Sequence, residues 1–265
     1  MTSRYQEVPP PAHLRPWVQC LWAMELPAAV PGHRVLPDGC IDILFESAGG
    51  DGELYVVGMM TRPLLVTRAA ATAFTAVRFK PGAAAAFLRE PLHRLTDERV
   101  DLRDLWGEAG ALREQLAAAP HAAQRVGLLV KELERRLDAA SRRGHAGCSD
   151  AVRRLAREPE TGVQDLCAHL GVSRQGLARS FREHVGVSPK TLGRVLRLQH
   201  ALRLLESGAG GGPPRWVDVA TAAGYYDQSH LIAEWKELVG LTPSAYLIES
   251  GREFPFFQDS PSGRG

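Results

Sequence analysis

The chain has 265 residues, of which 45% are hydrophobic and 23% are charged. This length predicts about two folded domains, and the composition excludes a wholly disordered chain. The 32 basic and 30 acidic residues give a formal net charge of +2. As an average, that near-balance argues mildly against a nucleic-acid-binding protein.

Neither a membrane-spanning segment nor a signal peptide is predicted. No apolar run is long enough to cross a bilayer, and the first residues lack a charged start followed by an apolar stretch. The four cysteines, Cys20, Cys40, Cys148 and Cys167, form no CxxC pair. We therefore expect a reduced, cytoplasmic protein without a metal site or a cofactor.

The first half of the chain is predicted to be β-rich. Short runs of strand-forming residues lie at 17–24, 41–45, 54–57, 64–67 and 74–79. Turn residues separate them at Pro31-Gly32, Pro37-Asp38-Gly39, Gly49-Gly50-Asp51-Gly52 and Pro81-Gly82. The pattern predicts a small antiparallel barrel or sandwich with accompanying helices over residues 1–106, including a short helix at 83–88.

The second half is predicted to be helical. Apolar residues recur at helical spacing within 107–147, which we interpret as a helical connector followed by a linker at 141–147. Its apolar stripe suits either pairing with a second copy or packing the barrel onto the C-terminal domain. Residues 148–250 form an all-α domain. The remaining tail, 251–265, is predicted to be mobile, unless its phenylalanines (Phe254, Phe256 and Phe257) dock onto the body.

An internal repeat of 54 residues lies in this helical domain. Its first copy starts at Ser173 and its second at Asp227, and both are good helix N-caps. The matched positions that follow are Leu177 and Leu231, Phe181 and Trp235, Arg182 and Lys236, Gly186 and Gly240, and Pro189 and Pro243.

Each part of the repeat has a structural role. The apolar positions share one helix face, the glycine ends the helix, and the proline starts the next one. Upstream apolar stripes add a preceding helix to each copy, at Val163, Leu166, Cys167 and Leu170 and at Val217, Ala220 and Ala223. Each copy therefore predicts a helix-turn-helix unit. A continuous helix over 189–206, about 25 Å long, would place two units in successive DNA major grooves, roughly 34 Å apart.

Residues 149–250 resemble the DNA-binding domain of AraC/XylS-type transcriptional regulators. The resemblance rests on VQDLCAHLGVS at 163–173, GVSPK at 186–190, AAGYYDQSH at 222–230 and GLTPSAY at 240–246. Ahead of it, Pro37–Asp42 and Arg78–Gly82 look like an uncharacterised N-terminal module found before such domains. The resemblance implies an N-terminal part that senses a small molecule or mediates dimerisation.

The DNA contacts are predicted on the helix faces that point away from the packing stripe. In the first unit these residues are Arg174, Gln175, Ala178, Arg179 and Arg182, and in the second Gln228, Ser229, His230, Ile232 and Lys236. Arginine can bond guanine bidentately, glutamine can bond adenine, and Ile232 can touch a thymine methyl. The family often carries arginine where Ala233 stands, so we expect weaker base reading by the second unit.

Local charge favours the same asymmetry. The span 173–203 has a net charge of +6, and the span 204–250 has a net charge of −4. A charge run is usually only a solvated face, but here it coincides with a predicted recognition helix. We predict that the first unit dominates affinity for double-stranded DNA. The second unit adds weaker contacts or faces a protein partner such as RNA polymerase.

In the first half, candidate pocket residues are Trp17, Trp22, His33, Asp38, Cys40, Asp42, Arg78 and Phe79. The alternative is that they are core aromatics and surface polar groups. Of these, we select Trp22, His33, Asp38, Cys40 and Arg78 as effector contacts. Three hypotheses remain: an effector-responsive one-component regulator, a DNA-binding module with an enzymatic or cysteine-reactive N-terminus, and a structural DNA protein. No catalytic motif is present, so we favour a regulator that is not an enzyme.

Overall fold

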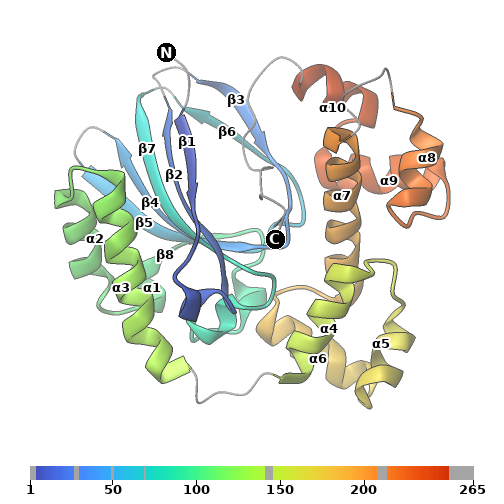
Figure 1. The fold of residues 1–265 in the computed structure, drawn as a ribbon, viewed down its shortest axis with the longest axis horizontal. Coiled ribbons are helices and arrows are strands. Elements are labelled where there is room, and N and C mark those ends of the chain that lie inside the picture. Colours follow the sequence, from blue (N-terminus) through green and yellow to red (C-terminus); the bar gives the residue numbers. More distant parts are fainter. Residues whose placement is uncertain are drawn as a thin grey trace.

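The computed structural model of the chain describes residues 4–26, 30–48, 51–68, 70–140, 146–207 and 214–250. A β-rich N-terminal part and a helical C-terminal part lie side by side, and helix α7 (Pro189–Ser207) runs along the side of the helical part that faces the sheet (Figure 1). The predicted tail and residues 141–145 of the predicted linker lie outside the described residues.

The main sheet has the strand order β1-β2-β7-β4-β5-β8, with every neighbouring pair antiparallel. A two-stranded ribbon, β3 (Val30–Val35) with β6 (Leu64–Arg68), stands apart from it. The strands of the main sheet are β1 (Arg4–Val8), β2 (Val18–Leu26), β4 (Ile41–Ala48), β5 (Asp51–Val57), β7 (Thr72–Phe79) and β8 (Arg99–Asp101).

Three strands, β1, β3 and β8, were not marked by the sequence pattern. The predicted turn at Pro31-Gly32 is wrong, because both residues lie inside β3. A proline is tolerated there because β3 pairs only with β6, and the register shifts between Val30 and His33. β8 has three residues, which is too short for a periodic signal.

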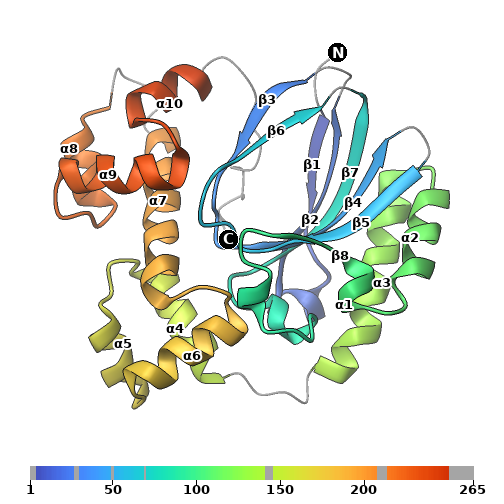
Figure 2. The same ribbon diagram turned by 180° about the vertical axis from the view of Figure 1, so that it is seen from behind.

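Alternating side chains give the main sheet two different faces. On one face, Ile43, Phe45 and Val77 belong to a core that includes buried leucines of α2 (Ala109–Ala118) and α3 (Ala122–Ala140). The helical stretch predicted as a connector therefore packs on the sheet and is part of the N-terminal domain, with α1 (Leu102–Leu105) beside it (Figure 2). The other face carries a separate apolar cluster that faces the ribbon.

The C-terminal domain contains two helix-turn-helix units joined by α7. The first is α5 (Val163–Leu170) with α6 (Arg174–His184), and the second is α8 (Trp216–Ala222) with α9 (Gln228–Val239). Helices α4 (Ala146–Arg157) and α10 (Pro243–Ser250) flank them. Both predicted prolines begin helices, and Gly186 and Gly240 have φ of +99° and +78°, as the repeat predicts. Val217 departs from its predicted inward stripe, since it is 46% exposed.

The two domains share one continuous core. The predicted short helix is a 3-10 turn, η2 (Ala84–Ala86), and a second turn, η3 (Leu92–Arg94), packs against α6; a third 3-10 turn, η1 (Ala12–Leu14), precedes β2. Polar contacts join the domains just before α7 and near the middle of it. Thr96 Oγ1 donates to the Gly186 carbonyl at 2.8 Å, and Gln199 Nε2 donates to the Pro37 carbonyl at 2.7 Å.

Candidate functional site

The first recognition helix, α6, is held by its cap and its buried face. The Ser173 hydroxyl accepts a hydrogen bond from the Gly176 N–H at 3.0 Å, which fixes the start of the helix. Leu177 and Phe181 are buried against the domain core. The opposite face is therefore turned to solvent, and its exposed residues are Arg174, Gln175, Ala178, Arg179 and Arg182.

Arg179, one of the three arginines on this face, forms an ion pair with Glu183 of the same helix. Its side chain is 83% exposed, and its Nε donates to Glu183 at 3.0 Å, one helical turn away. The same hydrogen bond lowers the pKa of the Glu183 carboxyl. Because an exposed pair of this kind contributes little stability, the guanidinium can exchange Glu183 for a base edge or a phosphate.

The second recognition helix, α9, is built in the same way but presents fewer cations. The Asp227 carboxylate accepts from the His230 N–H at 2.7 Å, and Leu231 and Trp235 are fully buried. Gln228, Ser229 and Lys236 are exposed. Ile232 is half-buried and packs against the core, which reduces the surface it can offer to a thymine methyl.

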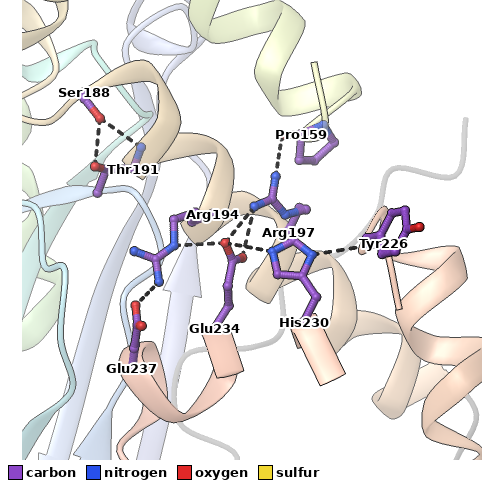
Figure 3. Close-up of polar contacts among 9 residues, drawn as sticks. All are labelled: Pro159, Ser188, Thr191, Arg194, Arg197, Tyr226, His230, Glu234 and Glu237. Atoms are coloured by element: carbon purple, nitrogen blue, oxygen red, sulfur yellow. Dashed lines mark hydrogen bonds and ion pairs between the residues drawn. The ribbon is translucent and has the colours of Figure 1, made fainter. Parts of the chain in front are cut away.

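The His230 ring points toward Glu234 and the turn before α9, although its side chain is still 40% exposed (Figure 3). Its Nδ1 accepts from the Tyr226 N–H at 3.3 Å, so the neutral ring carries its proton on Nε2. That Nε2 lies 3.3 Å from Glu234. The ring therefore links the turn before α9 to a carboxylate inside the domain, which favours a positioning role over base contact.

Glu234 is the centre of a charged network between α9 and α7 (Figure 3). It is 8% exposed and accepts from Arg194 Nε at 3.0 Å and from Arg197 Nη2, which is 3.0 Å from each of its oxygens. Arg194 also pairs with the exposed Glu237. Two arginines of the connecting helix thus hold the second recognition helix in one orientation.

This network accounts for part of the positive charge in the span 173–203. Arg194 and Arg197 contribute to the +6 span, yet they are neutralised by glutamates of the −4 span. The predicted asymmetry between the recognition helices is still present in their own residues. α6 exposes three arginines beside one glutamate, whereas α9 exposes Lys236 beside the exposed Glu237.

A cavity of about 1830 Å³ lies between the second face of the sheet, the β3–β6 ribbon and helices α7 and α10. It is lined by all five predicted effector residues, Trp22, His33, Asp38, Cys40 and Arg78, and by Asp42. Trp17 and Phe79, which the sequence also placed in a pocket, pack instead on the core side of the sheet. Side chains alternate along a strand, so the neighbours Arg78 and Phe79 point to opposite faces of the sheet, one into the cavity and the other into the core.

One end of the cavity contains a buried ion pair. Arg78 donates from Nε and Nη2 to the two oxygens of Asp42, at 3.2 Å and 3.0 Å, and Asp38 lies 3.5 Å away. Burial raises the pKa of the Asp42 carboxyl, and the Arg78 guanidinium opposes that shift. Asp38 accepts from the Cys40 N–H at 2.9 Å, which fixes the turn before β4.

The two cysteines near this end are poor nucleophiles. Burial raises the pKa of the Cys20 thiol to about 12 and that of the Cys40 thiol well above its ordinary value. Reaction with an electrophile requires the thiolate, so both side chains are in the unreactive form near neutral pH. This disfavours the cysteine-reactive hypothesis.

Sequence reasoning missed three residues that join elements distant in the chain. Arg34 of β3 donates to the Val239 carbonyl at 3.2 Å and to Glu249 at 2.9 Å, which ties the ribbon to the end of α9 and to α10. Gln199 and Glu234 form the contacts described above. Of the three, only Glu234 had a weak signal in the sequence. The equivalent position of the first repeat copy is Ser180, so the two copies differ there in charge.

Comparison with known families divides the chain in the same way. Residues 6–101 match a family described as a domain of unknown function (DUF6597), and residues 166–248 match a family described as a helix-turn-helix domain. Within the described parts of the chain, none of the helices has both the length and the apolar character that a bilayer crossing requires.

Curated relatives match the C-terminal part. The chain is 28% identical over 96 residues to the HTH-type transcriptional regulator MtrA of Neisseria gonorrhoeae, covering 36% of this chain and 31% of the relative. It is 36% identical over 81 residues to the HTH-type transcriptional regulator GlxA of Rhizobium meliloti (strain 1021), covering 31% of this chain and 24% of the relative. The matches therefore span less than a third of either relative's length.

Among solved structures, ToxT from Vibrio cholerae is similar with a TM-score of 0.44 and 9% sequence identity, covering 94% of this chain and 98% of that chain. The repeat, the two capped recognition helices and the family match agree on the C-terminal half. The chain thus combines a helix-turn-helix domain of the AraC type with an N-terminal domain from a family of unknown function.

Proposed function

We propose that this chain is a transcriptional regulator that binds double-stranded DNA sequence-specifically through α6 and α9. The observation that carries the proposal is the placement of two solvent-facing recognition helices at the ends of one connecting helix. α7 has 19 residues. A helix of that length is about 28 Å long. It suits the placement of α6 and α9, called here the first and the second head, in successive major grooves on one face of the DNA.

The first head is proposed to dominate binding. The exposed arginines of α6 supply both bidentate base contacts and phosphate contacts, and they raise the salt dependence of binding. α9 contributes through Gln228, Ser229 and Lys236, and its remaining surface is open to RNA polymerase or to a second copy of the chain. The family match of the C-terminal domain supports DNA binding, and the difference between the two helices is supported by their exposed charges.

The N-terminal domain is proposed to hold a small-molecule effector in the cavity between the sheet and α7. Two contacts support communication with the DNA-binding units. Gln199 of α7 donates to the Pro37 carbonyl, and Arg34 joins the ribbon to α9 and α10. A ligand that shifts the ribbon therefore acts directly on the second head. These contacts support the proposal of a one-component regulator over that of an enzyme or a purely structural DNA protein.

Selection of bound DNA from a random pool tests the proposal. We expect enrichment of a site with two half-sites about 10 bp apart, with the stronger sequence preference in one of them. Repetition of the selection with a metabolite panel tests effector response. Recovery of DNA without any enriched sequence would support the structural-protein hypothesis instead.

A further inference from the structure

One wall of the cavity is a second, smaller apolar cluster, whose side chains are each at most 8% exposed. Trp22, Leu44, Tyr55 and Phe74 project from adjacent strands into one cluster, which is separate from the core shared by the two domains. All four line the cavity. A cluster of aromatic side chains facing a cavity of this volume provides a surface on which an organic molecule can pack.

The polar end of the same cavity has an excess of negative charge. The Arg78 guanidinium bridges Asp42 and Asp38, and each carboxylate carries a full charge when ionised. One cation thus faces two anions. Outside the cavity lining, Glu7 of β1 accepts from the Tyr5 hydroxyl at 2.5 Å, and its negative charge acts on Cys20 of the neighbouring strand β2.

The cavity lining as a whole also has an excess of negative charge. Among the described residues, six carboxylates and four guanidinium groups line the cavity as a whole. Of the two carboxylates at the polar end, Asp38 is the more accessible, since its side chain is 24% exposed and that of Asp42 is 11% exposed. An incoming group therefore meets Asp38 before it meets the buried pair.

We propose that the cavity binds an organic cation, an ammonium compound with an aromatic or aliphatic body. The ammonium lies against Asp38 beside the Asp42–Arg78 pair, and the body packs on Trp22, Tyr55 and Phe74. An ammonium group supplies the missing positive charge at a partly buried site, where charge compensation is worth more than in water. The faces of aromatic rings also attract cations. The Tyr55 ring already does so, since the guanidinium carbon of Arg99 lies 3.7 Å from its centroid.

A carboxylate ligand is disfavoured by the same arrangement. Its charge would meet Asp38 and Asp42, while Arg78, the one guanidinium that the described residues place at that end, is already engaged by both. Like charges at short range repel more strongly in a partly buried site than in water. The charge of the ligand, rather than its size, is therefore the property that the site selects. The inference rests on the proposed function only in calling this ligand an effector.

Binding to the full chain, without DNA, tests the inference. The probes are two matched sets, 3-phenylpropylamine with 3-phenylpropanol and 3-phenylpropanoate, and octylamine with octanol and octanoate. Calorimetric titration at constant ionic strength is expected to show binding of an amine from at least one set and weaker binding of its alcohol and acid. The inference is overturned if neither amine binds, or if an acid or alcohol binds as tightly as its amine.

Two variants test the location. Asp38→Asn keeps an oxygen to accept from the Cys40 N–H, so the turn is retained, and amine affinity is expected to fall about tenfold. Glu114→Gln makes the same charge change on an exposed residue of α2 outside the cavity, and amine affinity should be unchanged. Equal affinities of the two variants would overturn the assignment to Asp38. DNA binding with and without amine then tests the proposed function separately.

Discussion

The Nη2 atom of Arg197 lies 3.0 Å from each carboxylate oxygen of Glu234, which joins the connecting helix to the second recognition helix. Glu234 also accepts from Arg194, so one buried carboxylate receives two guanidinium groups. The orientation of α9 relative to α7 is consequently set by charge as well as by apolar packing. The first head has no equivalent network among the described residues, since Ser180 takes the place of Glu234.

Replacement of Glu234 by glutamine should weaken the second head selectively. The variant leaves the partly buried Arg197 without its carboxylate partner and Arg194 with only the exposed Glu237, and we expect a loss of about 2 kcal/mol in the free energy of unfolding. In a footprinting experiment, protection of one half-site should be lost while the other remains. Urea denaturation and the footprint together check both effects.

Glu237→Gln is the matched control, because it removes the same charge from the same helix at an exposed position. Its side chain is 66% exposed, and the pair it forms with Arg194 lies at the surface. The expected change in unfolding free energy is below about 0.5 kcal/mol. Similar losses in the two variants would mean that surface charge, not the buried network, is responsible.

Arg179→Ala should reduce DNA affinity more than Gln228→Ala. Loss of a bidentate arginine contact is expected to weaken specific binding about tenfold or more, and to lower the salt dependence if the contact is to phosphate. Lys131→Ala, an exposed change on α3, serves as a control for lost charge. Fluorescence anisotropy at several salt concentrations measures all three. A larger loss for Gln228→Ala contradicts the dominance of the first head.

Cys20 and Cys40 should resist alkylation in the folded protein. At about pH 8 a thiol with a pKa of about 12 is only about 0.01% thiolate, and burial further limits access. Labelling by iodoacetamide should accelerate as pH rises toward 12, because deprotonation of Cys20 continues over that range. Mass spectrometry with and without urea checks this. A rapid adduct on either cysteine of the folded chain would revive the cysteine-reactive hypothesis.

Gly186→Ala should destabilise the junction between the domains. Gly186 has φ +99°, and a Cβ there would lie 3.0 Å from the Leu92 carbonyl oxygen and from Thr96 Oγ1. We expect a loss of about 1–3 kcal/mol in unfolding free energy. Gly127→Ala is the control, because Gly127 is inside α3 with nothing within 4 Å of an added Cβ. That change should stabilise the chain by about 0.5–1 kcal/mol.

The helical half of the fold could be predicted in detail from local signals. Ser173 and Asp227 cap their helices through the hydrogen bonds that their side chains suggest, and the apolar positions at fixed spacing from them are buried. These features depend on residues within one or two helical turns. The repeat also compensates for weak individual signals, since each position is supported by its equivalent in the other copy.

The pairing of distant elements could not be predicted. Arg34 contacts Glu249 across 215 residues, and nothing in the neighbourhood of either residue indicates a partner. The same holds for the strand β3, whose Pro31-Gly32 is typical of a turn. The cavity residues were selected by type, and only strand alternation in a known register separates Arg78 from Phe79.

The first recognition helix ends in a loop that is shaped by the N-terminal domain. Thr96 donates to the Gly186 carbonyl, Val185 lies beside Gly82, and Leu192 lies beside Gly39. A chimaera that carries only residues 146–250 would lose this support and expose apolar side chains to water. The smallest part of the described chain that keeps these contacts is therefore the joined pair of domains.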